Sequence, residues 1–279
     1  MISVEKHHFN WNKVGIIALI IFVVLIFIFP IYWMIITSFK SDADILTRPP
    51  TWWFKPTIKN YIHAFKHANF GLFMVNSLIV AVTSTIIVVC LSFLCAYGFA
   101  RYNTVGRDQF MFFILSTRMF PQIAVVIPYF VLFRNFRLLD TRIAMIILYT
   151  MFNLPFAIWL MHSFIKDIPV DLEEAARVDG YSRWRILRKI ILPLVAPGLA
   201  VTAIFCLLFS WNEFLFAFLL TRTRAATITV GVSSFWTQRG ILWGPLCAAA
   251  AVCVIPMMIF VALLQKYIVR GLTFGAIKG

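Results

Sequence analysis

Six long apolar segments constrain the fold of this chain more than any other feature of its sequence. They cover residues 14–37, 73–99, 110–133, 143–164, 198–220 and 245–264. A transmembrane helix needs about 20 predominantly apolar residues, and each segment reaches that length. Because the segments are continuously apolar and do not alternate with polar residues, they exclude a transmembrane β-barrel. The sequence therefore predicts an all-α, polytopic membrane protein with six transmembrane helices.

The composition agrees with a membrane protein and excludes several other classes. Hydrophobic residues make up 62% of the 279 residues and charged residues only 13%, which leaves too little polar sequence to coat a soluble globule. The net charge of +14 is spread over the short loops between segments, so we interpret it as a membrane-flanking feature and expect no nucleic-acid partner. The five cysteines lie inside apolar segments without Cys-x-x-Cys spacing, so we expect neither a disulfide framework nor a metal site.

Six segments place both termini on one side of the membrane. We expect a cytoplasmic tail at 1–13, one membrane domain at 14–264 and a second cytoplasmic tail at 265–279, because Lys and Arg are slightly more numerous on that side. No small-residue cleavage site follows the first segment, so we expect a retained helix and not a signal peptide. Five prolines are expected to kink the helices where these face neighbours or a wet cavity. They are Pro30, Pro121, Pro128, Pro155 and Pro256.

The loop at 166–196, between the fourth and fifth segments, has the pattern of two short helices. Asp171 and Glu174 have the spacing of a capping box at the start of the first helix, and Gly180 is expected in a left-handed bend after it. Ser182 is the predicted N-cap of the second helix. Trp184, Leu187 and Ile191 are predicted to share one face of that helix, until Pro193 turns the chain back toward the membrane.

Two interpretations of this loop remain open from its residues alone. It is either an amphipathic element lying on lipid headgroups or a docking element for another protein. Seven positions of the loop resemble the EAA loop of the membrane subunits of bacterial ABC importers. These positions are Glu174, Ala175, Ala176, Gly180, Ile190, Leu192 and Pro193. Residues 153–159, 210–215 and 270–279 are similar to the carbohydrate-importing branch, specifically to subunits equivalent to the smaller permease of the maltose importer.

The resemblance implies a permease subunit that forms half of a translocation pathway for a sugar or polyol. It implies that the seven positions and Asp179 couple the spans to a separate cytoplasmic ATPase, which holds the ATP and Mg²⁺. The chain contains no Gly-x-x-x-x-Gly-Lys-Ser/Thr motif, so we expect no cofactor in the chain itself and no enzyme activity. The implied partners are a second homologous permease, two ATPase subunits and an extracytoplasmic solute-binding protein. The implied location is the cytoplasmic (inner) membrane of a bacterium.

Polar and aromatic residues inside the spans are candidates for the substrate pathway. Arg118 and Glu213 are the two charged residues deep within a segment, where charges are costly and usually face the bundle interior. With Asn153, Asn212 and the ring of Trp211, they are predicted to line a polar path suited to sugar hydroxyls, with Phe120 and Phe152 as further stacking surfaces. The alternative is a structural role in hydrogen bonds between helices or in a charge pair with the partner permease.

Two other function classes stay open at this stage. An ion-coupled secondary transporter would need an intramembrane carboxylate relay, for which a single Glu is a poor candidate. A membrane-embedded enzyme would need a nucleophile, a base and an orienting group, or a metal, and we identify no such catalytic set in the sequence.

Overall fold

The structure is a computed structural model that describes residues 11–102, 105–238 and 240–276. The chain divides into two compact units, Met1–His67 with Phe235–Val252 and Ala68–Ser234 with Cys253–Gly279. Helices account for almost all of the secondary structure, and the described strands are limited to one two-stranded hairpin. The predicted all-α class is therefore confirmed.

The first unit contains the long helix α1 (Trp11–Ser38), the short helices α2 (Asp42–Leu46) and α3 (Lys59–Ile62), and a π-helical turn (His63–His67). It also contains the hairpin of β1 (Trp236–Thr237) and β2 (Gly240–Ile241) and the beginning of α14 (Trp243–Ala276). Asn60 holds the end of α1 by donating to the backbone oxygens of Ser38 and Lys40, at 2.9 and 2.8 Å. Lys40 is buried with its Nζ over the ring of Trp33, so this cation is shielded from the membrane.

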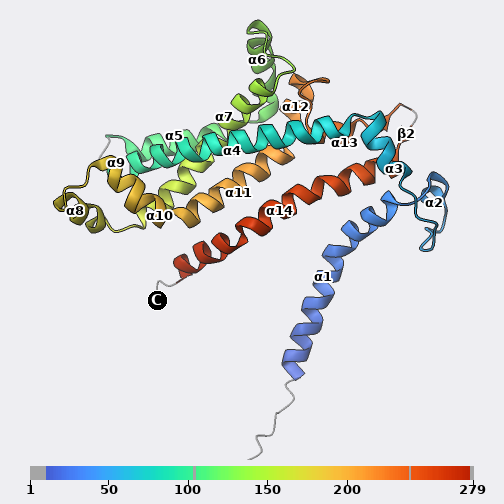
Figure 1. Ribbon diagram of the computed structural model, residues 1–279, viewed down its shortest axis with the longest axis horizontal. Coiled ribbons are helices and arrows are strands. Elements are labelled where there is room, and N and C mark those ends of the chain that lie inside the picture. Colours follow the sequence, from blue (N-terminus) through green and yellow to red (C-terminus); the bar gives the residue numbers. More distant parts are fainter. Residues whose placement is uncertain (1–10, 103–104, 239, 277–279) are drawn as a thin grey trace, which may run out of the picture. The chain divides into compact units, whose positions relative to one another are not determined.

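The second unit contains the part of α14 from Cys253 onward and the rest of the helices. They are α4 (Phe70–Arg101), α5 (Arg107–Thr117), α6 (Gln122–Asn135), α7 (Arg142–Lys166), α8 (Asp171–Val178), α9 (Arg183–Ile186), a π-helical turn (Leu187–Ile191), α10 (Leu192–Leu194), α11 (Ala196–Asn212), α12 (Leu215–Leu220) and α13 (Ile228–Ser233). Helices α4, α7 and α11 lie side by side and form the core, whereas α6 leaves this bundle at a steep angle (Figure 1). The close approach of α11 to α7 depends on Gly198, because a Cβ there would overlap the ring of Phe164.

Four helices are long and apolar enough to cross a membrane, and the number rises to six if each of two bent helix pairs is one span. The third apolar segment is not one continuous helix, because α5 and α6 meet at 83° on either side of residues 118–121. Pro121, which lacks an amide hydrogen, occupies the N-cap of α6 at this break. Pro30, Pro128, Pro155 and Pro256 lie inside helices as expected.

The fifth apolar segment is also divided, which corrects the predicted span at 198–220. Helix α11 ends at Asn212, and the short helix α12 follows as a separate element. The carboxylate of Glu213 explains the restart, because it accepts from the amides of Phe216 (2.8 Å) and Ala217 (3.2 Å). The bent pair in this region instead joins 183–194 to Ala196–Asn212, at 73°.

Asp140 joins two loops at the end of the second unit near the start of α4. Its carboxylate accepts from the backbone amides of Arg222, Thr223, Arg224 and Ala225, at 2.9–3.3 Å. Burial of the Asp140 carboxyl raises its pKa, but the amide donors outweigh burial and lower the pKa overall. Asn76 of α4 reinforces this end by donating to the carbonyls of Arg224 and Ala226 and accepting from Arg142.

Part of the sequence analysis falls on residues without a description. The side chains from 266 onward and the backbone of 277–279 lie outside the described residues. The similarity of 270–279 to the carbohydrate branch and the predicted tails at 1–13 and 265–279 therefore stay predictions.

Candidate functional site

The first candidate site is the loop between α7 and α11, and its two helices form as the sequence predicts. Gly180 has a φ of +80° and ends the first helix, with open space around its Cα. The Ser182 side chain accepts from the amide of Arg185 at 3.4 Å and caps α9. The loop is therefore a helix–glycine bend–helix element, and the bend needs glycine for its backbone angle and not for lack of room.

Two details of the predicted loop are wrong. Asp171 is the first residue of α8 and not its cap, because Val170 occupies the N-cap without a side-chain hydrogen bond. Trp184 is 65% exposed and does not share the buried face of Leu187 and Ile191, which Ile186 joins instead. The π-helical turn at Leu187–Ile191 explains why Ile186 shares this buried face. A π-helical turn has a wider period than an α-helix, so Ile186 and Ile191, five residues apart, point to the same side.

Helix α8 has one face buried within the chain and one face exposed. Glu173 and Ala176, three residues apart, face inward, and Ala176 packs in an apolar cluster with Phe93 and Ile165. The EAA positions Glu174 and Ala175 are on the exposed side. Asp179, Gly180, Leu192 and Pro193 are exposed too, and Ile190 is half-buried.

The sequence analysis missed the charged cluster beneath α8. Glu173 is 0% exposed and accepts from the Tyr97 hydroxyl at 2.7 Å and from Nε of Arg101. A second guanidinium nitrogen of Arg101 donates to the carbonyls of Ile165 (3.2 Å) and Ile168 (2.9 Å), at the end of α7. The sequence alone does not show which of the two adjacent glutamates is buried. The only indication is that Glu173 is three positions before Ala176, so the two residues share one face of a helix.

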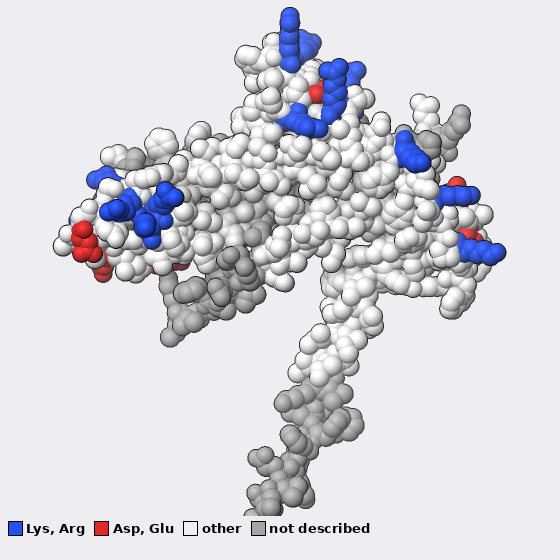
Figure 2. Space-filling view, in the orientation of Figure 1, with Lys and Arg blue, Asp and Glu red and all other residues white. Residues whose placement is uncertain are grey.

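The exposed surface of the loop combines apolar and basic groups. Val178 is 89% exposed, and Trp184, six residues later, is exposed as well. Lys and Arg side chains gather over this α8–α9 end of the second unit, with acidic side chains next to them (Figure 2). The exposed cations of α9 and the following turn are Arg183, Arg185, Arg188 and Lys189.

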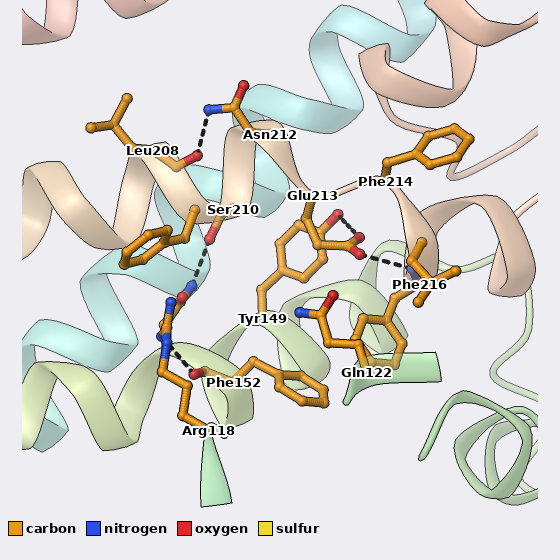
Figure 3. A pocket seen from close by; sticks show the side chains of 13 residues that line it. Arg118, Gln122, Tyr149, Phe152, Leu208, Ser210, Asn212, Glu213, Phe214 and Phe216 are labelled. Atoms are coloured by element: carbon orange, nitrogen blue, oxygen red, sulfur yellow. Dashed lines mark hydrogen bonds between the residues drawn. The ribbon is translucent and has the colours of Figure 1, made fainter. Parts of the chain in front are cut away.

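The second candidate site is a cavity of about 740 Å³ at the breaks between α5 and α6 and between α11 and α12. It is lined by Arg118, Gln122, Tyr149, Phe152, Asn153, Leu208, Phe209, Ser210, Asn212, Glu213, Phe214, Leu215 and Phe216. Four of the five predicted pathway residues line it, and most of the labelled side chains turn toward a common space (Figure 3). Trp211 is the exception, because its ring is buried and does not line the cavity. Phe152 lines the cavity, whereas the exposed Phe120 does not.

Arg118 presents a cation to the cavity. Its guanidinium lies 4.2 Å from the ring centre of Phe209 and 5.2 Å from that of Phe156, and it donates to the carbonyl of Phe152 at 3.0 Å. No carboxylate of the described residues lies within ion-pair distance of it. The remaining N–H groups of this guanidinium are therefore available to oxygen atoms in the cavity.

Glu213, Asn153 and Asn212 of the cavity already have partners in the fold. The Glu213 carboxylate accepts from amides in the first turn of α12 and from the Tyr149 hydroxyl at 2.9 Å (Figure 3). Asn153 is 3% exposed and donates from α7 to the Ser210 hydroxyl of α11 at 2.9 Å. Asn212 is exposed and donates only to Leu208 of its own helix. Sequence reasoning missed Gln122 and Tyr149, which are common residue types without a motif around them. It also missed Ser210, which begins the segment 210–215 but gave no separate signal of a role.

The chain is similar in sequence and in fold to known transport proteins. Residues 88–274 match the family described as binding-protein-dependent transport system inner membrane component. The trehalose/maltose transport system permease protein MalG of Thermococcus litoralis is 39% identical over 263 residues, or 93% of this chain and 94% of that protein. The trehalose transport system permease protein SugB of Mycobacterium tuberculosis is 37% identical, with 90% of this chain and 92% of that protein covered.

The fold is similar to that of a chain in a crystal structure of a bacterial ABC transporter involved in the import of the acidic polysaccharide alginate. The TM-score is 0.77 at 23% identity, with 95% of this chain and all of that chain covered. The stretch matched to the family, 88–274, contains the whole α7–α11 loop and every residue that lines the cavity. Both candidate sites therefore lie in the part of the chain shared with these proteins.

Proposed function

Because the chain belongs to the family of binding-protein-dependent transport system inner membrane components, we propose that it is the permease subunit of an ATP-driven importer whose cargo is a sugar or polyol. Relatives named as sugar permeases cover nearly all of the chain, which supports the carbohydrate class. The resemblance to ABC importer permeases is confirmed by the family match. The expectation of a multi-pass protein of the inner membrane is confirmed as well.

The exposed face of α8 is the observation that carries the coupling part of this proposal. An interfacial helix inserts its apolar face into the bilayer. The buried side of α8 packs through Ala176 against residues of α4 and α7, and its exposed side carries the carboxylates Asp171, Glu174 and Asp179 beside the apolar Leu172 and Val178. Carboxylates gain nothing on an anionic membrane surface. The exposed face, with Val178 and Trp184, therefore suits docking to a protein, which we propose is the ATPase.

The energy source belongs to that partner in this proposal. ATP and Mg²⁺ bind in a pair of ATPase subunits, a second homologous permease supplies the other half of the pathway, and an extracytoplasmic solute-binding protein delivers the cargo. The family description itself refers to binding-protein-dependent transport. We place both termini in the cytoplasm, on the side of the docking loop.

The cavity is the proposed contribution of this chain to the pathway. Arg118 and Asn212 present donors and acceptors suited to hydroxyl groups, and the ring of Phe152 offers an apolar surface to a sugar face. Glu213 and Asn153 support the walls of the cavity through their bonds to Tyr149 and Ser210.

Reconstitution of the complex tests the proposed function. The chain is purified through a tag after expression in its native cells, and uptake into proteoliposomes is measured with trehalose, maltose and other sugars. We expect an ATPase to co-purify and uptake to need ATP and the binding protein. Uptake by the chain alone, driven by a proton or sodium gradient, would instead establish a secondary transporter.

A further inference from the structure

We propose that Glu173, Tyr97 and Arg101 form a latch that transmits movement of α8 to α4, and through α4 to the cavity. This inference rests on the proposed function, because it assumes that α8 is displaced by an ATPase. Glu173 is not one of the EAA positions, and the cluster that it forms with Tyr97 and Arg101 has a positioning role.

The latch joins three helices at one point. Glu173 comes from α8, Tyr97 and Arg101 come from the last turns of α4, and the carbonyls that Arg101 binds belong to Ile165 and Ile168 at the end of α7. The Ile165 carbonyl also accepts from the backbone amide of Ile168 at 3.2 Å, and Arg101 supplies a further donor to it and to the Ile168 carbonyl beyond the helix end. A single planar cation thus fixes α8 and α7 to α4 in one orientation.

The attachment is directional, unlike the other contacts of α8. Ala176 packs against apolar neighbours, and such contacts tolerate sliding because they have no preferred direction. Glu173 is fully buried and accepts one hydrogen bond from the Tyr97 hydroxyl and one charge-assisted hydrogen bond from Arg101. Loss of either partner would leave a buried polar group unsatisfied. Arg177 lies 3.9 Å from the same carboxylate at the exposed rim and adds a weaker contact. The geometry therefore resists displacement of α8 without α4.

Helix α4 connects the latch to the rest of the second unit without interruption. It contains no proline from Phe70 to Arg101, whereas α7 contains Pro155. Thirteen residues before Tyr97, about 20 Å along the helix, the hydroxyl of Ser84 lies 3.4 Å from that of Ser210 in the cavity wall. A rigid shift of α4 at the latch therefore reaches the cavity directly.

The test measures transmission in the assembled complex and does not depend on which sugar is carried. A reporter cysteine is introduced by Asn212→Cys in a background without the native cysteines. Its labelling rate with a maleimide is compared before and after ATP and vanadate trap the ATPase. We expect trapping to change the labelling rate, and Glu173→Gln to reduce that change by about tenfold, the equivalent of one charged hydrogen bond. Asp108→Asn makes the same carboxylate-to-amide change at an exposed position of α5, away from the docking face and the latch, and should leave the change intact.

Co-purified ATPase separates this role from a merely structural one. If the latch exists, the Glu173→Gln complex retains the ATPase, but ATP and vanadate change the labelling rate of the reporter cysteine less than in the parent complex. If the variant keeps both the ATPase and the full nucleotide effect, the latch is refuted. A nucleotide effect that is absent in the parent complex, with the ATPase bound, also refutes it. Failure of the parent chain to retain any ATPase would instead refute the proposed function.

Two milder variants cover the case in which Glu173→Gln is not recovered. Tyr97→Phe removes one hydrogen bond without changing the packing volume by more than an oxygen atom. Arg101→Lys keeps the charge, but its compact ammonium cannot hold all three acceptors in a plane. We expect each variant to retain the ATPase and to transmit less than the parent complex. Full transmission in both would overturn the latch.

Discussion

Asn153 and Asn212 show how the surroundings of a side chain determine its role. Asn153 is buried and bridges two helices, whereas Asn212 is exposed to the cavity and bonds only within α11. We therefore expect Asn153→Ala to lower the stability of the purified complex by about 0.6 kcal/mol or more, the size of a typical hydrogen bond between membrane helices. Thermal unfolding in detergent measures this change.

Asn212→Ala is the matched control for that prediction. It removes the same amide, but we expect normal thermal stability together with altered uptake kinetics, because the lost group faces the cavity. The division of roles would be contradicted if Asn153→Ala melted like the parent complex and changed only uptake.

The carboxylate of Asp140 leads to a prediction about pH. Its pKa is lower in the folded chain than the value of about 3.9 in an unfolded chain. Its stabilising effect is therefore complete above that unfolded value and is lost as the pH falls through the lower, folded value. Asp140→Asn should destabilise the complex at neutral pH by at most about 1 kcal/mol, since the carboxylate is partly open to water.

Melting curves of both forms at a series of pH values check this sign. The difference between the parent chain and Asp140→Asn should be constant near neutral pH and should shrink below about pH 4. Asp108→Asn is the control, because its ion pair with Arg107 is exposed and should contribute little at any pH. A difference that grows on acidification would contradict the assigned role.

At the scale of elements, apolar length and local caps were sufficient to predict most helices, but not where two of them break. The break at 118–121 falls at Pro121, which the sequence marks as a kink, and Arg118 at this break contacts the distant ring of Phe209. At the other break, Glu213 accepts from the distant hydroxyl of Tyr149. Hydropathy does not record such contacts, so 110–133 and 198–220 each read as one span. The loop was predictable because Gly180 and Ser182 act locally, whereas the burial of Glu173 depends on α4.

The bend between α8 and α9 leads to a prediction about backbone conformation. Gly180 has open space for a Cβ, so substitution should cost only backbone strain, of roughly 1 kcal/mol for Gly180→Ala and more for a β-branched residue. Gly180→Asn should be tolerated better, since asparagine adopts the left-handed conformation more readily. We expect the amount of co-purified ATPase to fall in the order Gly, Asn, Ala, Val. Equal recovery with Gly180→Val would show that the bend is not needed for docking.

At the scale of the whole molecule, α4 separates the two polar ends of the second unit. Asn76 and Tyr97 are 21 residues apart on this helix, which corresponds to about 32 Å and matches the thickness of the hydrocarbon core. The Asp140 loops gather around Asn76, and the latch gathers around Tyr97. The face seen in Figure 2 carries few charged side chains between these ends. The docking loop and the Asp140 loops should therefore lie on opposite sides of the membrane.

Cysteine labelling in intact cells tests this arrangement and its direction. Phe136 and Val178 are both strongly exposed, and neither belongs to the cavity or to the latch. In a background without the native cysteines, Phe136→Cys should react with a membrane-impermeant maleimide, and Val178→Cys should react only after the cells are lysed. This outcome follows from placing the ATPase, and hence α8, in the cytoplasm. Reaction of both positions before lysis would mean that α4 does not cross the bilayer. The reverse pattern would place α8 outside, away from any cytoplasmic ATPase, and would remove the physical basis for coupling through this loop.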